Sequence, residues 1–311
     1  MTNSINRLQN SPYLQRIVAA QLLVWPQHED YLRGHFEGLD ETILIISEEV
    51  AELVLQLAGE RLEEFCEDYK WMCNNFIIED VHFRKTGKYR WSNFSEAYSQ
   101  IYSDHDYMSR YINGILFSQI LWTNQIVSFA YYVNTFLPGL NEGDDLLEIG
   151  PGHGLLLYFA AKQKKLKSIS AWDVSQSSIS ATDNALKSLC VNRQINLTLQ
   201  NILDPLVQTT SYHAVVFSEV LEHLDYPSVA LKNVYEAMHP GGRLFLNVPI
   251  NSPAPDHIYL WNTPEEVVEL VKSCGFEVES TLLAPATGFS EAQARKRKVT
   301  INTLIVAVRP K

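Results

Sequence analysis

Residues 146–154 read LLEIGPGHG, and this short stretch constrains the fold more than any other part of the chain. An apolar run ends at three glycines, Gly150, Gly152 and Gly154, which alternate with other residues. A strand with this ending must turn sharply into a helix, because glycine adopts positive φ angles at little steric cost. Glycine also lacks the Cβ atom that would keep a ligand away from the backbone. The pattern predicts a strand-to-helix turn that touches a ligand; a tight turn without a ligand is the alternative.

Strands and helices alternate along the chain after residue 140. Short apolar runs predict strands, and runs with apolar residues every three or four positions predict helices between them. This alternation predicts an α/β fold, a doubly wound, mostly parallel seven-stranded sheet with helices on both faces. Ligands of such sheets bind beyond the carboxyl ends of the strands. The expected strands are 145–150, 168–173, 195–201, 212–220, 243–249, 276–285 and 299–308, and the expected helices are 154–163, 177–192, 227–241 and 263–275.

The first 140 residues lack strands and are typical of helices. Apolar residues recur every three or four positions in 48–76, and the tyrosine-rich segment 95–136 has the same helical character. The sequence LPGLNEGDD, at 137–145, is a cluster of turn-forming residues. We therefore expect two parts: a helical domain over 1–140 that covers the substrate, and a ligand-binding sheet domain over 141–311.

The longest apolar stretch is 114–140, which Gln119, Asn124, Gln125 and Asn134 interrupt. Polar residues at this density favour a buried helix over a membrane span. The N-terminus has no basic region followed by an apolar core, so we expect no signal peptide.

Charge and cysteine content narrow the function classes. The formal net charge is −11, which argues against nucleic acid as the main partner, because proteins that grip phosphates are basic. The four cysteines form no CxxC pair and no histidine-flanked cluster, which argues against a zinc knuckle or a disulfide framework. Reduced thiols are typical of a cytoplasmic protein. The basic run Arg295–Lys298 is expected in a loop before the last strand, as a solvated face rather than a nucleic-acid contact.

The glycine spacing differs from that of a dinucleotide site, where the pattern is GxGxxG and the third glycine comes one residue later. Asp173 stands at the end of the next expected strand, where a carboxylate can accept hydrogen bonds from two ribose hydroxyls. The signature E-x-G-x-G-x-G, followed by an acid at the next strand end, resembles the class I methyltransferases that use S-adenosylmethionine (SAM). The resemblance covers about residues 140–311.

The resemblance implies further cofactor contacts. It places Asn201 and Ile202 against adenine, and Val174 beside Asp173 at the ribose. It implies that Glu148 approaches the cationic amino-acid end of SAM; a carboxylate that caps neighbouring backbone is the alternative. The fourth strand ends in SEVLEH, with Ser218 and Glu219 at the cofactor, similar to the ubiquinone and menaquinone methyltransferases.

The tyrosine-rich segment carries a second group of candidates. Tyr107, Tyr111, Gly114, Ser118 and Gln125 share one face of a single expected helix. Apolar residues fill the opposite side, Ile112, Ile115, Leu116 and Ile120. Tyrosine rings and phenolic oxygens stabilise a sulfonium cation. We expect this helix to wall the active site, with Tyr107 and Tyr111 catalytic and Ser118 at the cofactor; a helix with ordinary buried tyrosines is the alternative.

Two histidines follow strand ends at the expected cleft. Glu219, Glu222 and His223 are spaced i, i+3 and i+4, and His257 follows the fifth strand. We expect His223 or His257 to act as a general base without a metal ion. A divalent metal held by all four residues is the alternative, since the small-RNA 2′-O-methyltransferases have a similar Glu-x-x-Glu-His arrangement. A purely structural role is the third.

Together these features predict a cytoplasmic SAM-dependent methyltransferase that acts on a small molecule in a biosynthetic pathway, such as that of a natural product. It would be an α/β enzyme without a membrane partner, and the N-terminal helices could form a homodimer. A different SAM enzyme is the first alternative, one that attacks the aminocarboxypropyl chain, for example by cyclising SAM to azetidine-2-carboxylate with release of methylthioadenosine. A SAM-binding protein without catalysis is the second.

Overall fold

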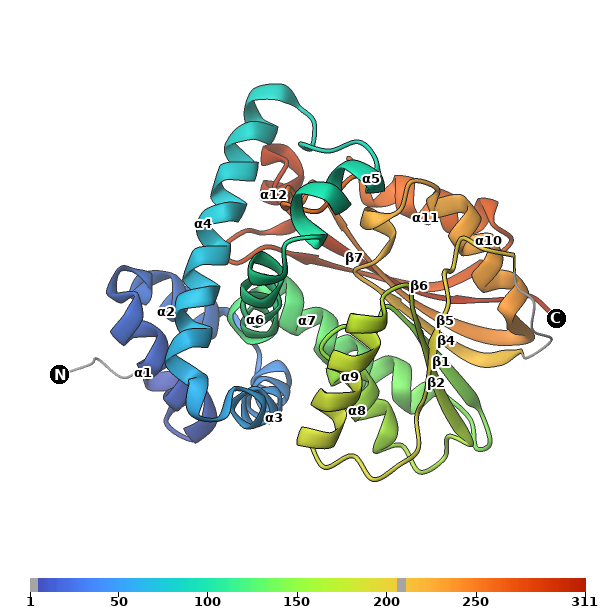
Figure 1. The fold of residues 1–311 in the computed structure, drawn as a ribbon, viewed down its shortest axis with the longest axis horizontal. Helices are drawn as coiled ribbons and strands as arrows, with labels where there is room; N and C mark the ends of the chain where they lie inside the picture. The colour runs from blue at the N-terminus through green and yellow to red at the C-terminus, as the bar shows by residue number, and fades with distance from the viewer. Residues whose placement is uncertain (1–4, 206–210) are drawn as a thin grey trace.

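The structure, a computed structural model, describes residues 5–205 and 211–311. Its first half is helical (Figure 1). Local sequence sets several helix ends: Asp40 caps α3 by accepting a hydrogen bond from the Ile43 N–H, and Gly87 ends α4 in the left-handed region. The seven helices are α1 (Pro12–Val24), α2 (Glu29–Gly38), α3 (Glu41–Ala58), α4 (Leu62–Thr86), α5 (Phe94–Ala97), α6 (His105–Leu121) and α7 (Thr123–Tyr131).

The second half is a seven-stranded sheet in the order β3-β2-β1-β4-β5-β7-β6. The first five strands run parallel, and β7 runs antiparallel between β5 and β6. This confirms the predicted mostly parallel α/β sheet. The strands are β1 (Asp145–Ile149), β2 (Ser168–Asp173), β3 (Asn196–Leu199), β4 (Tyr212–Ser218), β5 (Met238–Ile250), β6 (Glu277–Pro285) and β7 (Ile301–Val308); the helices are α8 (Leu155–Ala161), α9 (Gln176–Ser188), α10 (Pro227–Ala237), α11 (Pro264–Ser273) and α12 (Glu291–Arg297).

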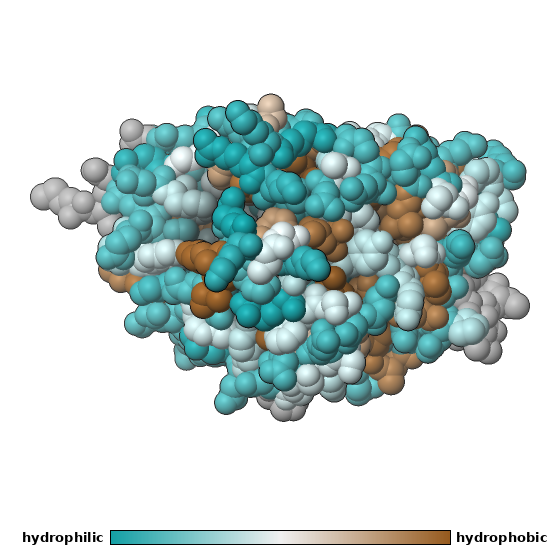
Figure 2. All heavy atoms as spheres, turned by 90° about the horizontal axis from the view of Figure 1, so that it is seen from above, coloured by the Kyte–Doolittle hydropathy of each residue, from teal (hydrophilic) through white to brown (hydrophobic). Residues whose placement is uncertain are grey.

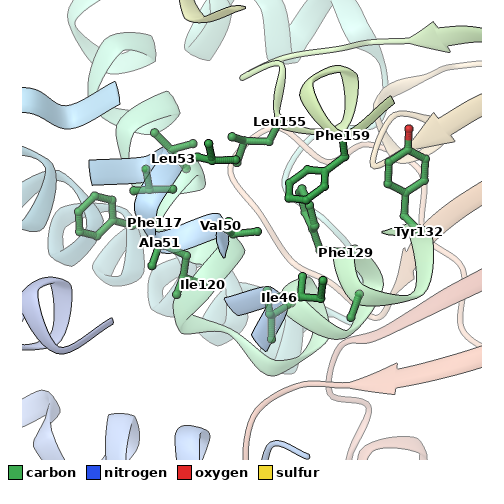
Figure 3. Packing of buried hydrophobic residues seen from close by; sticks show 14 of the residues in the cluster. Ile46, Val50, Ala51, Leu53, Phe117, Ile120, Phe129, Tyr132, Leu155 and Phe159 are labelled. Carbon is green, nitrogen blue, oxygen red and sulfur yellow. The ribbon is translucent and has the colours of Figure 1, made fainter. Parts of the chain in front are cut away.

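The N-terminal helices share a hydrophobic core with the sheet. Figure 3 shows Leu53 of α3 beside Leu155 of α8 and Phe129 of α7 beside Phe159 of α8, and the Phe129 and Phe159 rings pack edge to face at 5.2 Å. A second core lies between the sheet and α10 and α11. Because the first core is continuous, α3, α6 and α7 are held against the sheet, and α6 and α7 lie between α4 and the strands (Figure 1).

Three expectations about elements were wrong. The single helix through Tyr107 and Gln125 is two helices, α6 and α7, because Trp122 is extended between them. The helix expected to end at Gly241 ends at Ala237, and β5 begins at Met238. The basic run Arg295–Lys298, expected in a loop, lies mostly in α12, which begins with a capping box at Ser290.

Within residues 5–205 and 211–311, no helix is long and apolar enough to cross a membrane. The apolar stretch 114–140 is divided among α6, α7 and the turns that follow, and much of it is buried. On the face seen in Figure 2, hydrophobic residues form separate patches among hydrophilic ones. All four cysteines are free thiols, and three of them are buried.

Candidate active site

A large cavity lies where the carboxyl ends of the parallel strands meet the N-terminal helices. Its volume is about 1730 Å³. Pockets for one small molecule are usually about 300–1,000 Å³, so this cavity has room for two ligands side by side. Its lining comes from the turn after β1, the ends of β2 and β4, the loop after β5, and helices α4, α6 and α7.

The glycine turn forms one wall. Gly150, Gly152 and Gly154 all have positive φ, at 68°, 49° and 74°. A Cβ atom on Gly150 would lie 2.6 Å from Cγ2 of Val220, so a side chain there would also clash with the loop after β4. Gly150 and Gly152 line the cavity with bare backbone, as the sequence predicted.

Asp173 ends β2 at the neighbouring strand, and its carboxylate faces the same cavity. One oxygen accepts a hydrogen bond from the Ser175 N–H at 2.9 Å, and the other accepts one from the Ser178 hydroxyl at 2.7 Å. Burial raises the pKa of Asp173, and these donors oppose the rise. Each oxygen keeps a second lone pair, so the fixed carboxylate can accept hydrogen bonds from a diol.

Glu148 lies inside β1 between β2 and β4, and it is 2% exposed. It lines the cavity, and its Oε2 atom has no hydrogen-bond partner among the described residues. Burial raises the pKa of this carboxyl well above its usual range. An unpartnered buried carboxylate suits a cationic group in the cavity.

The other expected cofactor contacts divide into two groups. Val174, Ile202 and Ser218 line the cavity, and Ile202 is 3% exposed. Gly154 and Asn201 are adjacent to it without lining it: Gly154 begins α8, and Asn201 Oδ1 accepts a hydrogen bond from the Leu203 N–H.

Glu219 follows β4 with a positive φ of 55° and is surrounded by amides. Its Oε1 accepts hydrogen bonds from Asn247 at 3.0 Å and Asn302 at 2.7 Å, and its Oε2 accepts one from Gln125 at 3.4 Å. Burial raises the pKa of Glu219 to about 7, although the three amides oppose the rise. This carboxyl therefore titrates near neutral pH on the wall of the cavity.

Asp256 anchors another part of the cavity lining. Its Oδ1 accepts a hydrogen bond from the Tyr111 hydroxyl at 2.7 Å, and its Oδ2 accepts one from the Tyr102 hydroxyl at 3.0 Å. Burial alone would raise the pKa of Asp256, but His223, His257 and the two phenols hold it below its ordinary value. Asp256 is thus a buried carboxylate that stays ionised and fixes two tyrosines from the helical half.

His223 and His257 lie together beside Asp256, with ring centroids 4.9 Å apart. Nδ1 of His223 is 3.2 Å from both the Tyr102 hydroxyl and the Asp256 carbonyl oxygen. Nδ1 of His257 is 2.7 Å from the Ser252 carbonyl oxygen, and burial lowers the pKa of His257 to about 4. His257 is therefore a neutral imidazole at physiological pH, and both histidines line the cavity.

The predicted polar stripe is only partly at this site. Tyr111 and Gln125 line the cavity, but Tyr107 packs its ring against Trp71, with centroids 4.7 Å apart. Gly114 faces Met72 of α4, and the buried Ser118 hydroxyl donates to the Ile115 carbonyl of its own helix. Ile112, Ile115 and Leu116, expected on the opposite side, line the cavity instead. The misplaced residues all lie in α6, before the break at Trp122, so a different face of α6 lines the cavity.

Sequence reasoning missed Tyr102 and Asp256. Tyr102 ends a π-helical turn, Tyr98–Tyr102, and such turns often occur at functional sites. Asp256 directly precedes His257 in a proline-containing loop, and an acid beside a candidate base was the available signal. Their contact joins residues 154 positions apart, which no local pattern reveals.

Comparison with known families identifies the sheet region. A family model described as a methyltransferase domain matches residues 147–244. This segment runs from β1 into β5 and includes the glycine turn, Asp173 and Glu219.

Curated relatives match the same region. The mitochondrial ubiquinone biosynthesis O-methyltransferase of Candida albicans is 30% identical over 103 residues, which are 33% of this chain and 31% of the relative. The ubiquinone biosynthesis O-methyltransferase of Coxiella burnetii is 28% identical over 130 residues, 42% of this chain and 53% of the relative. The matches thus span about a third and about half of the relatives' own lengths.

Solved structures also match. N-methyltransferase NodS from Bradyrhizobium japonicum, in complex with S-adenosyl-L-homocysteine, aligns with a TM-score of 0.46 and 17% identity over 60% of this chain and 88% of that one. A putative methyltransferase from Bacillus halodurans aligns with a TM-score of 0.48 and 12% identity over 58% of this chain and 97% of that one.

Proposed function

We propose that this chain, which carries a class I SAM-dependent methyltransferase domain, transfers the methyl group of SAM to a hydroxylated small molecule bound in the same cavity. The observation that carries the proposal is the shared cavity. Glu148, Gly150 and Asp173, which we call the cofactor side, line it together with Tyr102, Tyr111, His223, Asp256 and His257, which we call the acceptor side.

The residues of the two sides have different tasks. SAM supplies an activated methyl group, so the protein must position the two reactants, exclude water and receive a proton. Asp173 would hold the ribose, and Glu148 would lie near the ammonium of the methionine end. The ionised Asp256 and its two tyrosines fix His223, and the histidine pair assists loss of the acceptor proton.

The chemistry of the acceptor follows from the lining beyond the histidines. Aromatic side chains dominate it, including Phe76, Phe94, Tyr98 and Trp122. Flat aromatic molecules pack well against such walls. The relatives are named for O-methylation in ubiquinone biosynthesis, which supports an oxygen nucleophile and a biosynthetic role. We therefore favour hydroxylated aromatic acceptors over nucleic acid, and we further propose a cytoplasmic enzyme that pairs through its N-terminal helices.

The products of the reaction test this function. The purified chain is incubated with SAM labelled on the methyl group, with and without a panel of hydroxylated aromatic compounds, and the products are analysed by mass spectrometry. Methyl transfer predicts S-adenosylhomocysteine and a labelled methyl ether that depends on the acceptor. Methylthioadenosine formed without any acceptor would instead select attack on the aminocarboxypropyl chain, and SAM binding with neither product would remove catalysis.

A further inference from the structure

Glu222 is the least satisfied polar side chain near the cavity. It is 0% exposed, and neither of its carboxylate oxygens has a hydrogen-bond partner among the described residues. Its backbone is firmly placed, because its carbonyl accepts hydrogen bonds from the N–H groups of Ile258 and Tyr259 at 2.9 and 3.0 Å. A buried carboxyl without partners is costly, so this side chain needs either a proton or a cation.

The two imidazoles beside Glu222 present lone pairs. The Ser252 carbonyl oxygen can only accept, so Nδ1 of His257 carries the proton and Nε2 is free to bind. The Asp256 carbonyl fixes Nδ1 of His223 in the same way, because the Tyr102 hydroxyl already donates to the Asp256 carboxylate. An imidazole whose Nδ1–H is held by a carbonyl is the usual form of a metal-binding histidine.

The spacing of the ligand atoms fits a metal ion between them. Oε1 of Glu222 and Nε2 of His223 are 3.8 Å apart, which is too long for a proton to be shared in a hydrogen bond. Two ligand atoms that each lie about 2.0–2.2 Å from one tetrahedral ion are about 3.3–3.6 Å apart, so a small inward shift of these side chains would bring both to an ion. One ligand atom from each of Glu222, His223 and His257 lies within 4.8 Å of the others.

The neighbouring acids do not complete this ligand set. Both oxygens of Glu219 accept hydrogen bonds from amides, and both oxygens of Asp256 accept hydrogen bonds from tyrosines. The group of ligand atoms that lie within 4.8 Å of one another contains Glu222, His223 and His257 and neither of these two acids. The four-ligand alternative from the sequence, which included Glu219, is thus reduced to three ligands.

We propose that Glu222, His223 and His257 bind a divalent first-row transition metal ion, of which Zn²⁺ is the representative, with a coordination position open toward the cavity. This proposal rests on the proposed methyl transfer and differs from the metal-free interpretation that the sequence favoured. Two imidazoles and one carboxylate suit such ions, and three protein ligands are typical of sites that also bind a substrate oxygen.

The ion would bind the hydroxyl oxygen of the acceptor and favour its ionised form near neutral pH. The hydroxyl proton passes to solvent, and the oxygen then forms a bond to the methyl carbon. The bond between that carbon and sulfur breaks, and its electron pair stays on sulfur, which leaves a neutral thioether. The acceptor class is therefore molecules with an ionisable hydroxyl group.

Metal binding is measured directly, without turnover. The chain is treated with a chelator, dialysed and titrated with Zn²⁺ by calorimetry, and the bound zinc is counted by elemental analysis. We expect one ion per chain. Glu222→Gln, which keeps the shape of the side chain, and His257→Gln should each weaken binding by at least about 100-fold. His239→Gln, at the amino end of β5, is the matched control and should bind zinc like the wild type.

The outcomes separate this inference from the proposed function. Circular dichroism checks that each variant is folded, and SAM affinity is measured on the same preparations. Absence of stoichiometric zinc binding, or equal binding in folded Glu222→Gln, overturns the metal site even if SAM still binds. Zinc binding that persists in Asp173→Ala while SAM affinity is lost supports two separate sites. Zinc binding without any SAM affinity in the wild type would support the metal site and contradict the methyl transfer.

Discussion

The cofactor side and the acceptor side of the cavity differ in how far apart in sequence their residues lie. Glu148, Gly150 and Asp173 fall within 26 consecutive positions and follow two neighbouring strands. Tyr102, His223 and Asp256 come from a π-helical turn, a 3-10 turn after β4 and the loop after β5. Backbone geometry makes the first side, whereas hydrogen bonds between distant side chains make the second. Substitutions on the cofactor side should therefore alter SAM affinity. Substitutions on the acceptor side should alter the free energy of unfolding and its dependence on pH.

The largest effect is expected from Gly150→Ala. A side chain there must adopt a positive φ, which costs about 1–2 kcal/mol, and its Cβ would lie 2.6 Å from Val220. We expect SAM affinity to fall by more than about 100-fold, as measured by calorimetry. Gly143→Ala is the control, because Gly143 also has a positive φ but nothing lies within 4 Å of its Cβ position. Equal loss of SAM affinity in both variants would mean that the close approach at Gly150 does not determine SAM affinity.

Glu219→Gln tests titration at the end of β4, between the two sides. The pKa of Glu219 is raised from 4.5 to about 7, so its protonated form is favoured by folding. The wild type should lose at most about 3 kcal/mol of unfolding free energy as pH rises from about 4.5 to 7. The glutamine variant should lack this loss.

Denaturant unfolding at several pH values, with a chelator present, measures the difference. Glu236→Gln, an exposed acid on α10, is the control and should follow the wild type. If the unfolding free energies of wild type and Glu219→Gln change with pH in parallel, Glu219 does not titrate in this range.

Tyr111→Phe tests the anchor at Asp256. The variant leaves an ionised, buried carboxylate with one donor fewer, which should cost about 1.5–3 kcal/mol of unfolding free energy. Tyr131→Phe removes a hydroxyl that bonds to Ser280 near the surface, and it should cost about 0.5–1 kcal/mol. SAM affinity should stay near the wild-type value in both. A large drop in SAM affinity for Tyr111→Phe would contradict the claim that the acceptor side does not determine SAM affinity.

The smallest effect is expected from Gly114→Ala. The sequence placed Gly114 at the active site, but its Cβ would lie 2.8 Å from Met72 of α4. We expect a net loss of about 1 kcal/mol, because overpacking outweighs the gain in helix propensity. Gly34→Ala in α2 has free space and should gain about 0.5–1 kcal/mol. Thermal unfolding compares the two, and stabilisation by Gly114→Ala would contradict this packing.

The sequence predicted what depends on local patterns. Alternating strands and helices predicted the sheet, and the glycines with Asp173 indicated where the large cavity lies. Tyr102 and Asp256 were not predicted, because their hydrogen bond joins residues 154 positions apart. Gly114 was misplaced because its face of α6 packs against α4, so another face of that helix lines the cavity. The N-terminal half thus needed tertiary structure that periodicity alone does not contain.

The most direct test of the central claim is a calorimetric titration of the wild type and Asp173→Ala with SAM. The carboxylate of Asp173 is held by Ser175 and Ser178 and faces the cavity, so it should be the charged acceptor of the ribose hydroxyls. We predict one SAM per wild-type chain and an affinity about 10- to 100-fold weaker in Asp173→Ala, or about 1.5–3 kcal/mol. Equal SAM affinity in the two proteins, or no binding by the folded wild type, would contradict the assignment of this cavity to SAM.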